Sequence, residues 1–283
     1  MTLKDALASA LTQLATANVG SPRLNAETLL MFVLCCDRAY LYAHPERILT
    51  SEECARLDRV IAERSRGVPA QYITGHQEFW GLDFIVTPDV LIPRPETEHL
   101  IETVLPLAQQ VRNPRIVDIG TGSGCIAVVL AKELPVADIH ATDSSVPALE
   151  IALTNAARNG VADRVQFHHA DLLPQFERDS FDFVVSNPPY VGEAEEDEVQ
   201  LEVRKFEPRQ AIFAGPLGME VISRLAPMAH VALKPEGWLV LEISGNIADA
   251  VRHELTNWSN LRITTDLQGI PRVASAQKQA MRN

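Results

Sequence analysis

Residues 115–131 read Arg115-Ile-Val-Asp-Ile-Gly-Thr-Gly-Ser-Gly-Cys-Ile-Ala-Val-Val-Leu-Ala131. A short apolar segment typical of a β-strand runs into Gly120, Gly122 and Gly124, and then into an apolar pattern typical of a helix. Glycines at this point allow a tight turn and let a ligand approach the backbone closely. The start of the helix offers free N–H groups. The stretch therefore predicts a nucleotide-binding strand–loop–helix unit.

The spacing of the glycines separates two kinds of ligand. The dinucleotide fingerprint G-x-G-x-x-G/A fits only if it starts at Gly122 and takes Ala127 as its third member. The form D-x-G-x-G-x-G fits from Asp118 without adjustment, and it is the pattern of methyltransferases that use S-adenosylmethionine. We therefore expect the loop to bind that cofactor through residues Gly120, Thr121, Gly122, Ser123 and Gly124.

Acidic residues follow the next two predicted strands, at residues 138–142 and 165–168. Asp143 is placed to accept hydrogen bonds from both ribose hydroxyls, although it could equally cap the helix that begins near Pro147. Asp171 and Leu172 stand where an adenine ring is gripped in such folds. We expect all three to contact the cofactor.

A fourth predicted strand, residues 181–185, leads into Ser186-Asn-Pro-Pro-Tyr190. Pro188 and Pro189 have fixed φ and no N–H, and the residue before each is pushed toward extended conformations. The rigid corner presents carbonyl oxygens and one carboxamide, a set that suits an –NH₂ group. Tyr190 adds a flat face. A plain proline-rich loop with an aromatic plug is the alternative interpretation of this segment.

Together, residues 118–124 and 187–190 resemble class I methyltransferases that act on planar nitrogens. Three further groups of residues narrow the resemblance to the peptide chain release factor glutamine methyltransferase family: 71–75 with 78–82, the segment Ile92-Pro-Arg-Pro-Glu-Thr-Glu98, and Phe206-Glu-Pro208. The resemblance covers nearly the whole chain. It implies methyl transfer from S-adenosylmethionine, with S-adenosylhomocysteine as product, to N5 of the Gln in a release factor's Gly-Gly-Gln loop. Asn187, Pro188, Pro189 and Tyr190 would then be the catalytic residues, and Asn187 would also contact the cofactor. Leu172 departs from the aromatic residue that family members often carry there.

Alternating strands and helices after Arg115 imply parallel βαβ units. We expect an α/β fold: a seven-stranded, mostly parallel, Rossmann-like methyltransferase sheet, with a small N-terminal helical bundle and a β-hairpin linker. Helices are expected near 125–134, 147–159, 219–233 and 247–257. The predicted domains are a helical substrate-docking domain (1–73), the hairpin linker (74–95) and the catalytic domain (96–283).

Within the linker, residues 79–86 and 90–92 are rich in aromatic and β-branched residues, which predicts two strands joined by Thr87-Pro-Asp89. The proline-containing segment that follows the second strand is stiff. It brings Arg94, Glu96 and Thr97 either to the cofactor site or to the cap of a helix at 96–110. Thr50-Ser-Glu-Glu53 predicts a capping box for a helix over 52–66.

Charge and cysteine content limit the partners and the compartment. The formal net charge of −12 argues against a general nucleic-acid-binding surface. Arg56, Arg59 and Arg66 form either a solvated helix face or a local basic patch, and the acidic run 193–198 either a solvated loop or a flap that meets a basic protein. Cys35 and Cys36 are expected to pack within an apolar helix. With no secretory signal or membrane-length apolar run, we expect a cytoplasmic monomer that needs no metal.

Three other functions fit the sequence less well. A methyltransferase of an exocyclic base amine in RNA or DNA would share the Asn-Pro-Pro-Tyr corner, but the chain is acidic and has no target-reading domain. An NAD-dependent oxidoreductase does not fit the loop spacing. A non-catalytic module would not need the intact glycine loop or Asn187.

Overall fold

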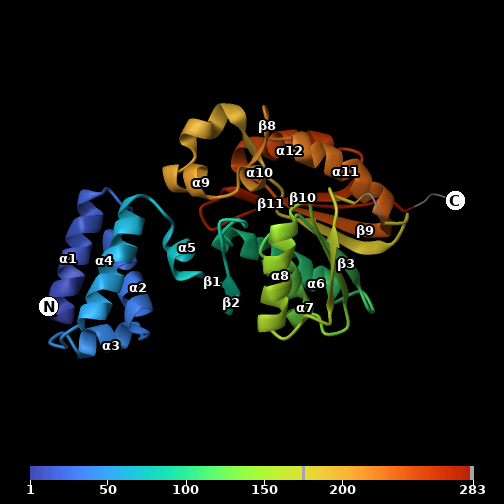
Figure 1. Cartoon of the computed structure of the whole chain (residues 1–283). Helices are drawn as coiled ribbons and strands as arrows, with labels where there is room; N and C mark the ends of the chain where they lie inside the picture. The colour runs from blue at the N-terminus through green and yellow to red at the C-terminus, as the bar shows by residue number, and fades with distance from the viewer. Residues whose placement is uncertain (174–175, 281–283) are drawn as a thin grey trace. The chain divides into compact units, whose positions relative to one another are not determined.

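The computed structural model describes residues 1–173 and 176–280, which form two compact units (Figure 1). The first contains Met1–His76 together with Gln200–Phe206, and the second contains Gln77–Val199 and Glu207–Asn283. The chain therefore returns to the first unit once, after much of the second has been formed.

The first unit is helical. Its helices are α1 (Leu3–Thr16), α2 (Pro22–Leu34), α3 (Arg38–Ala43), α4 (Ser51–Ser65), α5 (Ala70–Thr74) and the returning α9 (Leu201–Phe206). Leucine, valine and alanine side chains of α1, α2 and α4 bury a common core. The predicted capping box of α4 is confirmed: Thr50 accepts from the Glu53 N–H, and the Glu53 carboxylate accepts from the Thr50 N–H.

α9 is held to this bundle by an ion pair. Arg64 of α4 lies 2.6 Å from Glu202 of α9, and only 6% of the Arg64 side chain is exposed. Its guanidinium also donates to Asn25 and to the Val68 carbonyl. A buried guanidinium needs such partners.

The cysteine prediction holds only in part, because α2 ends at Leu34 and neither cysteine lies in the helix. Cys36 is partly buried and packs against the bundle core. Cys35 is exposed, which contradicts the prediction, because α2 ends at Leu34 and Cys35 takes a left-handed conformation with φ of 50°.

The second unit is built on the predicted seven-stranded sheet, in the order β10-β11-β9-β6-β3-β4-β5. Pairing is parallel from β9 to β5, while β11 runs antiparallel to both of its neighbours. The strands are β3 (Arg115–Ile119), β4 (Asp138–Asp143), β5 (Val165–His169), β6 (Phe181–Ser186), β9 (Leu233–Glu242), β10 (Ser259–Thr265) and β11 (Pro271–Gln277).

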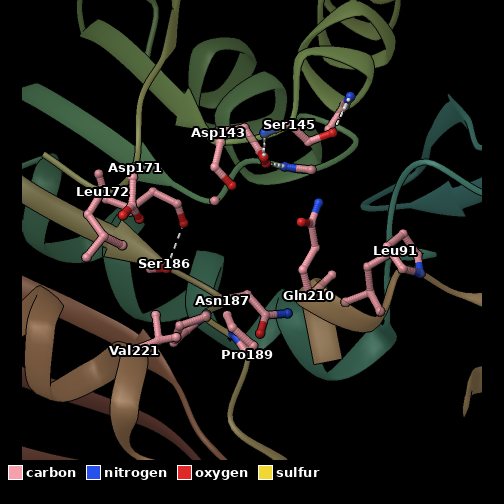
Figure 2. A pocket seen from close by; sticks show the side chains of 18 of the residues that line it. Leu91, Asp143, Ser145, Asp171, Leu172, Ser186, Asn187, Pro189, Gln210 and Val221 are labelled. Carbon is pink, nitrogen blue, oxygen red and sulfur yellow. Dashed lines mark hydrogen bonds between the residues drawn. The ribbon is translucent and has the colours of Figure 1, made fainter. Parts of the chain in front are cut away.

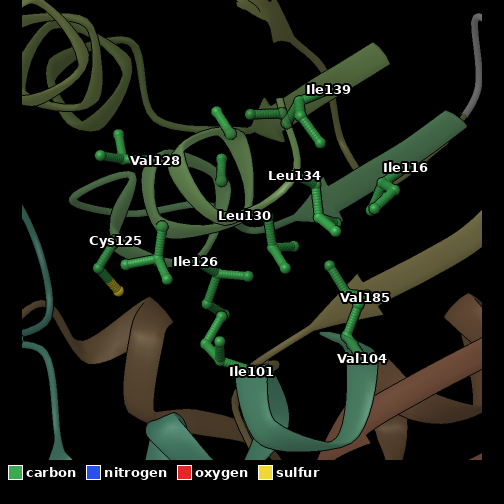
Figure 3. Packing of buried hydrophobic residues seen from close by; sticks show 14 of the residues in the cluster. Ile101, Val104, Ile116, Cys125, Ile126, Val128, Leu130, Leu134, Ile139 and Val185 are labelled. Atoms are coloured by element: carbon green, nitrogen blue, oxygen red, sulfur yellow. The ribbon is translucent and has the colours of Figure 1, made fainter. Parts of the chain in front are cut away.

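Helices cover both faces of the sheet (Figure 1). One face carries α6 (Glu98–Ala108), α7 (Cys125–Glu133) and α8 (Val146–Arg158), and the other carries α11 (Glu220–Ala232) and α12 (Ala248–Glu254). Because neighbouring residues of a strand point to opposite faces, Ile116 packs under the first set and Val117 under the second. Figure 3 shows the first of these two cores.

The predicted hairpin exists but its turn lies elsewhere. β1 (His76–Phe79) pairs with β2 (Leu82–Ile85), and residues 90–92 form no strand. Trp80 and Gly81 both have positive φ, 54° and 68°, as a two-residue hairpin turn requires. The prediction of the turn position was wrong because Trp rarely adopts a positive φ. The Trp-Gly pair therefore did not indicate a turn, whereas Thr-Pro-Asp did.

Several short elements complete the second unit. They are the 3₁₀ helices η1 (Pro95–Thr97), η2 (Glu193–Glu198) and η3 (Gly245–Ile247), helix α10 (Arg209–Ile212), and the paired strands β7 (Val191–Gly192) and β8 (Phe213–Gly215). The acidic run is thus η2, and Arg209 pairs with Glu196 in it at 2.7 Å. Among the described residues, no helix has the length and apolarity to span a bilayer.

Asn155 of α8 joins the hairpin to the glycine loop. It is fully buried, and its Nδ2 donates to the carbonyls of Ile85 at 2.9 Å and Ser123 at 2.8 Å. Its Oδ1 accepts from the Ile85 N–H at 2.7 Å. One carboxamide therefore satisfies three backbone groups from two segments.

Replacing Asn155 with Ala is expected to lower the free energy of unfolding by about 2–4 kcal/mol, because buried donors and acceptors lose their partners. Urea unfolding measures this. Thr154→Ala, at an exposed position of the same helix, is expected to change stability by no more than about 0.5 kcal/mol. Equal stability of the two variants would contradict the joining role of Asn155.

Candidate active site

A cavity opens at the carboxyl ends of four adjacent parallel strands (Figure 2). Its lining includes residues 119, 120 and 122 at the end of β3, 143–145 at the end of β4, 170–172 after β5, and 186–189 at the end of β6. Ligands of open α/β sheets bind at this edge, where the strand order reverses. Segments spread over about 70 positions of sequence thus meet at one place.

The three glycines of the loop do different work, although each has positive φ (70°, 54° and 80°). Gly120 and Gly122 line the cavity, and an added Cβ at either would meet no atom within 4 Å. At Gly124 an added Cβ would lie 3.0 Å from the Cβ of Ala152. The first two glycines leave room for a ligand, and the third lets α7 and α8 pack closely.

Thr121 and Ser123, also predicted to bind the cofactor, are buried and do not line the cavity. The Thr121 hydroxyl donates to Asp118 Oδ2 at 2.6 Å, and the Ser123 carbonyl accepts from Asn155. Both therefore shape the loop from beneath.

Asp118 holds this loop in place. It was not predicted as a site residue, although it is the first residue of the D-x-G-x-G-x-G motif. The residue is fully buried, and burial raises the pKa of its carboxyl to about 7. Its Oδ1 has no hydrogen-bond partner among the described residues. Asp118 acts on the loop through Thr121 and does not reach the cavity.

Asp143 lies in the cavity with its carboxylate held from two sides (Figure 2). Oδ2 accepts from the Gly122 N–H and Oδ1 from the Ser145 N–H, both at 2.8 Å. The cap of α8 is Ser145, whose side chain accepts from the Ala148 N–H. The alternative interpretation of Asp143 as a helix cap is therefore wrong.

Asp171 and Leu172 also line the cavity. Leu172 has a φ of 61° and is 9% exposed, so it presents an apolar surface from a strained backbone. Asp171 forms an exposed ion pair with Arg224 of α11. His168 lies outside the cavity, where its ring stacks on that of His140, and burial lowers the pKa of both.

The Asn-Pro-Pro corner lines the opposite part of the cavity. The Ser186 hydroxyl donates to the Ile119 carbonyl at 2.7 Å, which ties the end of β6 to the end of β3. Asn187 Nδ2 donates to Thr97 Oγ1 at 3.1 Å. No donor in the described part of the chain is bonded to Asn187 Oδ1, so that oxygen is the atom left for a ligand.

Tyr190 differs from the prediction. Its ring packs against the core under α11 and does not line the cavity, and its hydroxyl donates to Glu242 at 3.2 Å. Burial and the nearby Glu242 carboxylate raise the pKa of the phenol. A wall for a planar substrate group is therefore not supplied by this ring, because the core and Glu242 already hold it.

The remaining wall was not predicted. It consists of Asp89, Val90 and Leu91 from one segment and Pro208, Gln210 and Ala211 from another. The Gln210 carboxamide points into the cavity (Figure 2). Glu207 holds both segments: it is 6% exposed, accepts from the Ile92 N–H at 3.1 Å and pairs with Arg94. The one feature of the sequence that could have indicated this wall is the acidic residue within Phe206-Glu-Pro208.

The sequence left open whether Thr97 reaches the cofactor site or caps a helix, and the structure shows neither role. It is 2% exposed and makes no capping hydrogen bond from its side chain. Its hydroxyl instead meets Asn187 from behind. Within residues 1–173 and 176–280, no group of three or more His, Cys, Asp or Glu side chains could hold a metal ion.

The fold is that of a class I methyltransferase. A methyltransferase from Pyrococcus furiosus superposes with a TM-score of 0.53 at 18% identity, covering 80% of this chain and 98% of that one. The hMettl16 catalytic domain in complex with an RNA hairpin superposes with a TM-score of 0.58 at 19% identity, covering 79% and 84%. At such identities the likeness shows the fold alone.

Sequence comparison gives the family. The PrmC N-terminal domain model matches residues 5–75, and the methyltransferase small domain model matches residues 96–206. A release factor glutamine methyltransferase of Koribacter versatilis is 55% identical over 98% of this chain and 99% of its own length. One from Nitratidesulfovibrio vulgaris is 40% identical over 99% and 96%. The chain belongs to the release factor glutamine methyltransferase family; it is a methyltransferase enzyme, and its methyl donor is S-adenosylmethionine.

The geometry of the two glycines yields a paired prediction. Gly122→Ala is expected to cost about 1 kcal/mol of stability, from the positive φ, and to weaken S-adenosylmethionine binding at least about tenfold, because the methyl enters the cavity. Gly124→Ala is expected to cost about 2–4 kcal/mol, because the methyl also meets Ala152. Thermal unfolding and calorimetric titration separate the two effects. Wild-type affinity in Gly122→Ala would show that no ligand approaches there.

Proposed function

We propose that this enzyme transfers the methyl group of S-adenosylmethionine to N5 of the glutamine in the Gly-Gly-Gln loop of peptide chain release factors. The observation that carries the proposal is the orientation of Asn187. Its Nδ2 is used by Thr97, so Oδ1 remains as an acceptor beside the cavity. Membership of the release factor glutamine methyltransferase family supports the same substrate.

An amide nitrogen needs help to act as a nucleophile, because its lone pair is delocalised into the carbonyl. Asn187 Oδ1 and the Pro188 carbonyl would each accept one N–H of the substrate amide. Two acceptors orient the nitrogen and favour the positive charge that develops on it as the new C–N bond forms. S-adenosylmethionine supplies a methyl already activated on a sulfonium. The rest of the catalytic effect is proximity, and the nitrogen's proton leaves after transfer.

The cofactor site is proposed along the carboxyl ends of β3, β4 and β5. Gly120 and Gly122 offer backbone that a ligand can approach, Asp143 offers carboxylate oxygens to ribose hydroxyls, and Leu172 with Asp171 borders the adenine. The open space at both glycines fits a bound nucleoside. Thr121, Ser123 and Gly124 would support the loop without contacting the cofactor.

The proposed division of labour follows the predicted domains. Residues 1–73 would dock the substrate protein, residues 74–95 would link, and residues 96–283 would carry out catalysis. The acidic helix η2, next to the Asn-Pro-Pro corner, is suited to meet a basic protein. We propose a cytoplasmic location, because the proposed substrate acts in translation and the enzyme carries free cysteines. A monomer is the proposed state.

The decisive assay uses labelled S-adenosylmethionine with four substrates: a purified bacterial release factor, its loop Gln→Ala mutant, bulk RNA and DNA. Label is expected on the wild-type factor alone. Asn187→Ala is expected to lower kcat at least about 10²-fold, since an oriented acceptor is lost. Mass spectrometry of the loop peptide locates the methyl group.

Asn257→Ala, at an exposed position outside the cavity, is the matched control and should retain wild-type activity. Label on nucleic acid, with none on the release factor, would contradict the proposal and favour a base-amine methyltransferase.

A further inference from the structure

A chain of polar groups lies behind the Asn-Pro-Pro corner, out of reach of the cavity. Asn187 Nδ2 donates to Thr97 Oγ1 at 3.1 Å, and the Thr97 hydroxyl in turn faces the carboxyl of Glu242. The Tyr190 hydroxyl reaches the same carboxyl, 3.2 Å from Oε1. Thr97 and Glu242 are each 2% exposed, so water does not substitute for these partners.

The Glu242 carboxyl at the end of this series of polar groups sets the direction in which its hydrogen bonds are donated. An ionised carboxylate only accepts hydrogen bonds, so the hydroxyl protons of Thr97 and Tyr190 both point toward Glu242. The Thr97 oxygen then has only lone pairs left for Asn187, and it must receive an N–H. The carboxamide is thereby fixed with Nδ2 bonded to Thr97, which leaves Oδ1 as its acceptor for a ligand. Glu242 Oε2 has no hydrogen-bond partner among the described residues.

We infer that Thr97 and Glu242 are positioning residues that fix the orientation of the Asn187 carboxamide, and that protonation of Glu242 releases it. The inference rests on the proposed function, because it assigns Asn187 Oδ1 to the substrate N–H. A protonated Glu242 donates to Thr97, and the Thr97 hydroxyl then becomes free to donate to Asn187 Oδ1. The acceptor that the substrate needs is lost in that state.

The surroundings of Glu242 place this change in an accessible pH range. Burial raises the pKa of Glu242 to about 7, the hydrogen bonds from Thr97 and Tyr190 oppose that shift, Glu96 of η1 adds to it, and Arg272 of β11 opposes it. Cys125 of α7 also feels this carboxyl, but its thiol stays neutral because burial raises its pKa to about 12.

Four variants test the inference by methyl transfer to a purified release factor, with separate calorimetric titration of S-adenosylmethionine. Thr97→Val removes the hydroxyl and keeps the shape. It is expected to lower kcat by about 10- to 100-fold and to leave the Kd of S-adenosylmethionine within about twofold. Thr97→Ser is expected to restore most of the activity. Thr142→Val is the matched control, because Thr142 is fully buried and its hydroxyl has no partner among the described residues.

Glu242→Gln supplies the pH readout. In wild type, kcat is expected to fall as pH decreases from about 8.5 to 6, because the protonated carboxyl no longer directs Thr97. Glu242→Gln is expected to be slow and to show no such decrease, since its amide donates to Thr97 at every pH. Thermal unfolding confirms that the neutral side chain is accommodated.

The outcomes separate the two proposals. If wild type does not methylate the release factor, the proposed function fails and this inference with it. If wild type is active and Thr97→Val matches Thr142→Val, only the positioning role is overturned. An unchanged acid limb in Glu242→Gln likewise overturns the part assigned to Glu242.

Discussion

The winding of the sheet reverses at β3, and the cavity depends on that reversal. From β3 the chain moves outward to β4 and β5, then crosses back to β6 on the other side. The connections after β3 and β6 therefore diverge and leave a gap at their carboxyl ends. The Ser186 hydroxyl bonded to the Ile119 carbonyl ties the two strand ends together just below the gap. The glycine loop and the Asn-Pro-Pro corner occupy its two sides because they directly follow these two strands.

Parts of the site that lie in contiguous motifs were predictable from the sequence. Gly120, Gly122, Asp143 and Asn187 each follow a predicted strand, and parallel strands bring their carboxyl ends to one edge. The wall held by Glu207 was not predictable in this way. Glu207 and Ile92 are 115 positions apart, and no local pattern records that contact.

The directions of individual side chains within a correctly predicted motif were a second limit on what the sequence could predict. Thr121 and Ser123 belong to the glycine loop but face inward, and Tyr190 follows the two prolines but joins the core. A motif defines the backbone path, whereas the direction of each side chain depends on neighbours such as Asp118 and Glu242. The position of the hairpin turn failed for a related reason, since the Trp80 conformation is stabilised by contacts that include its N–H to Glu98.

Two buried carboxyls support the site at a cost to the fold. Asp118 holds the glycine loop and Glu242 stands behind Asn187, and burial raises the pKa of each to about 7. Between about pH 4 and 7 the unfolded chain loses these protons before the folded chain does, so ionisation lowers the free energy of unfolding as pH rises. Such a cost is typical of functional sites, where stability and activity compete.

The return of residues 200–206 to the helical unit has a consequence for how this protein can be divided. Arg64, buried in that unit, takes Glu202 as its partner from the segment that follows the Asn-Pro-Pro corner. A gene fragment that ends after the bundle would encode Arg64 without the Glu202 carboxylate. A fragment that begins after the bundle would encode α9 without the helices that α9 packs on. The two units are thus interleaved along the gene, and no single uninterrupted stretch of it encodes either unit whole.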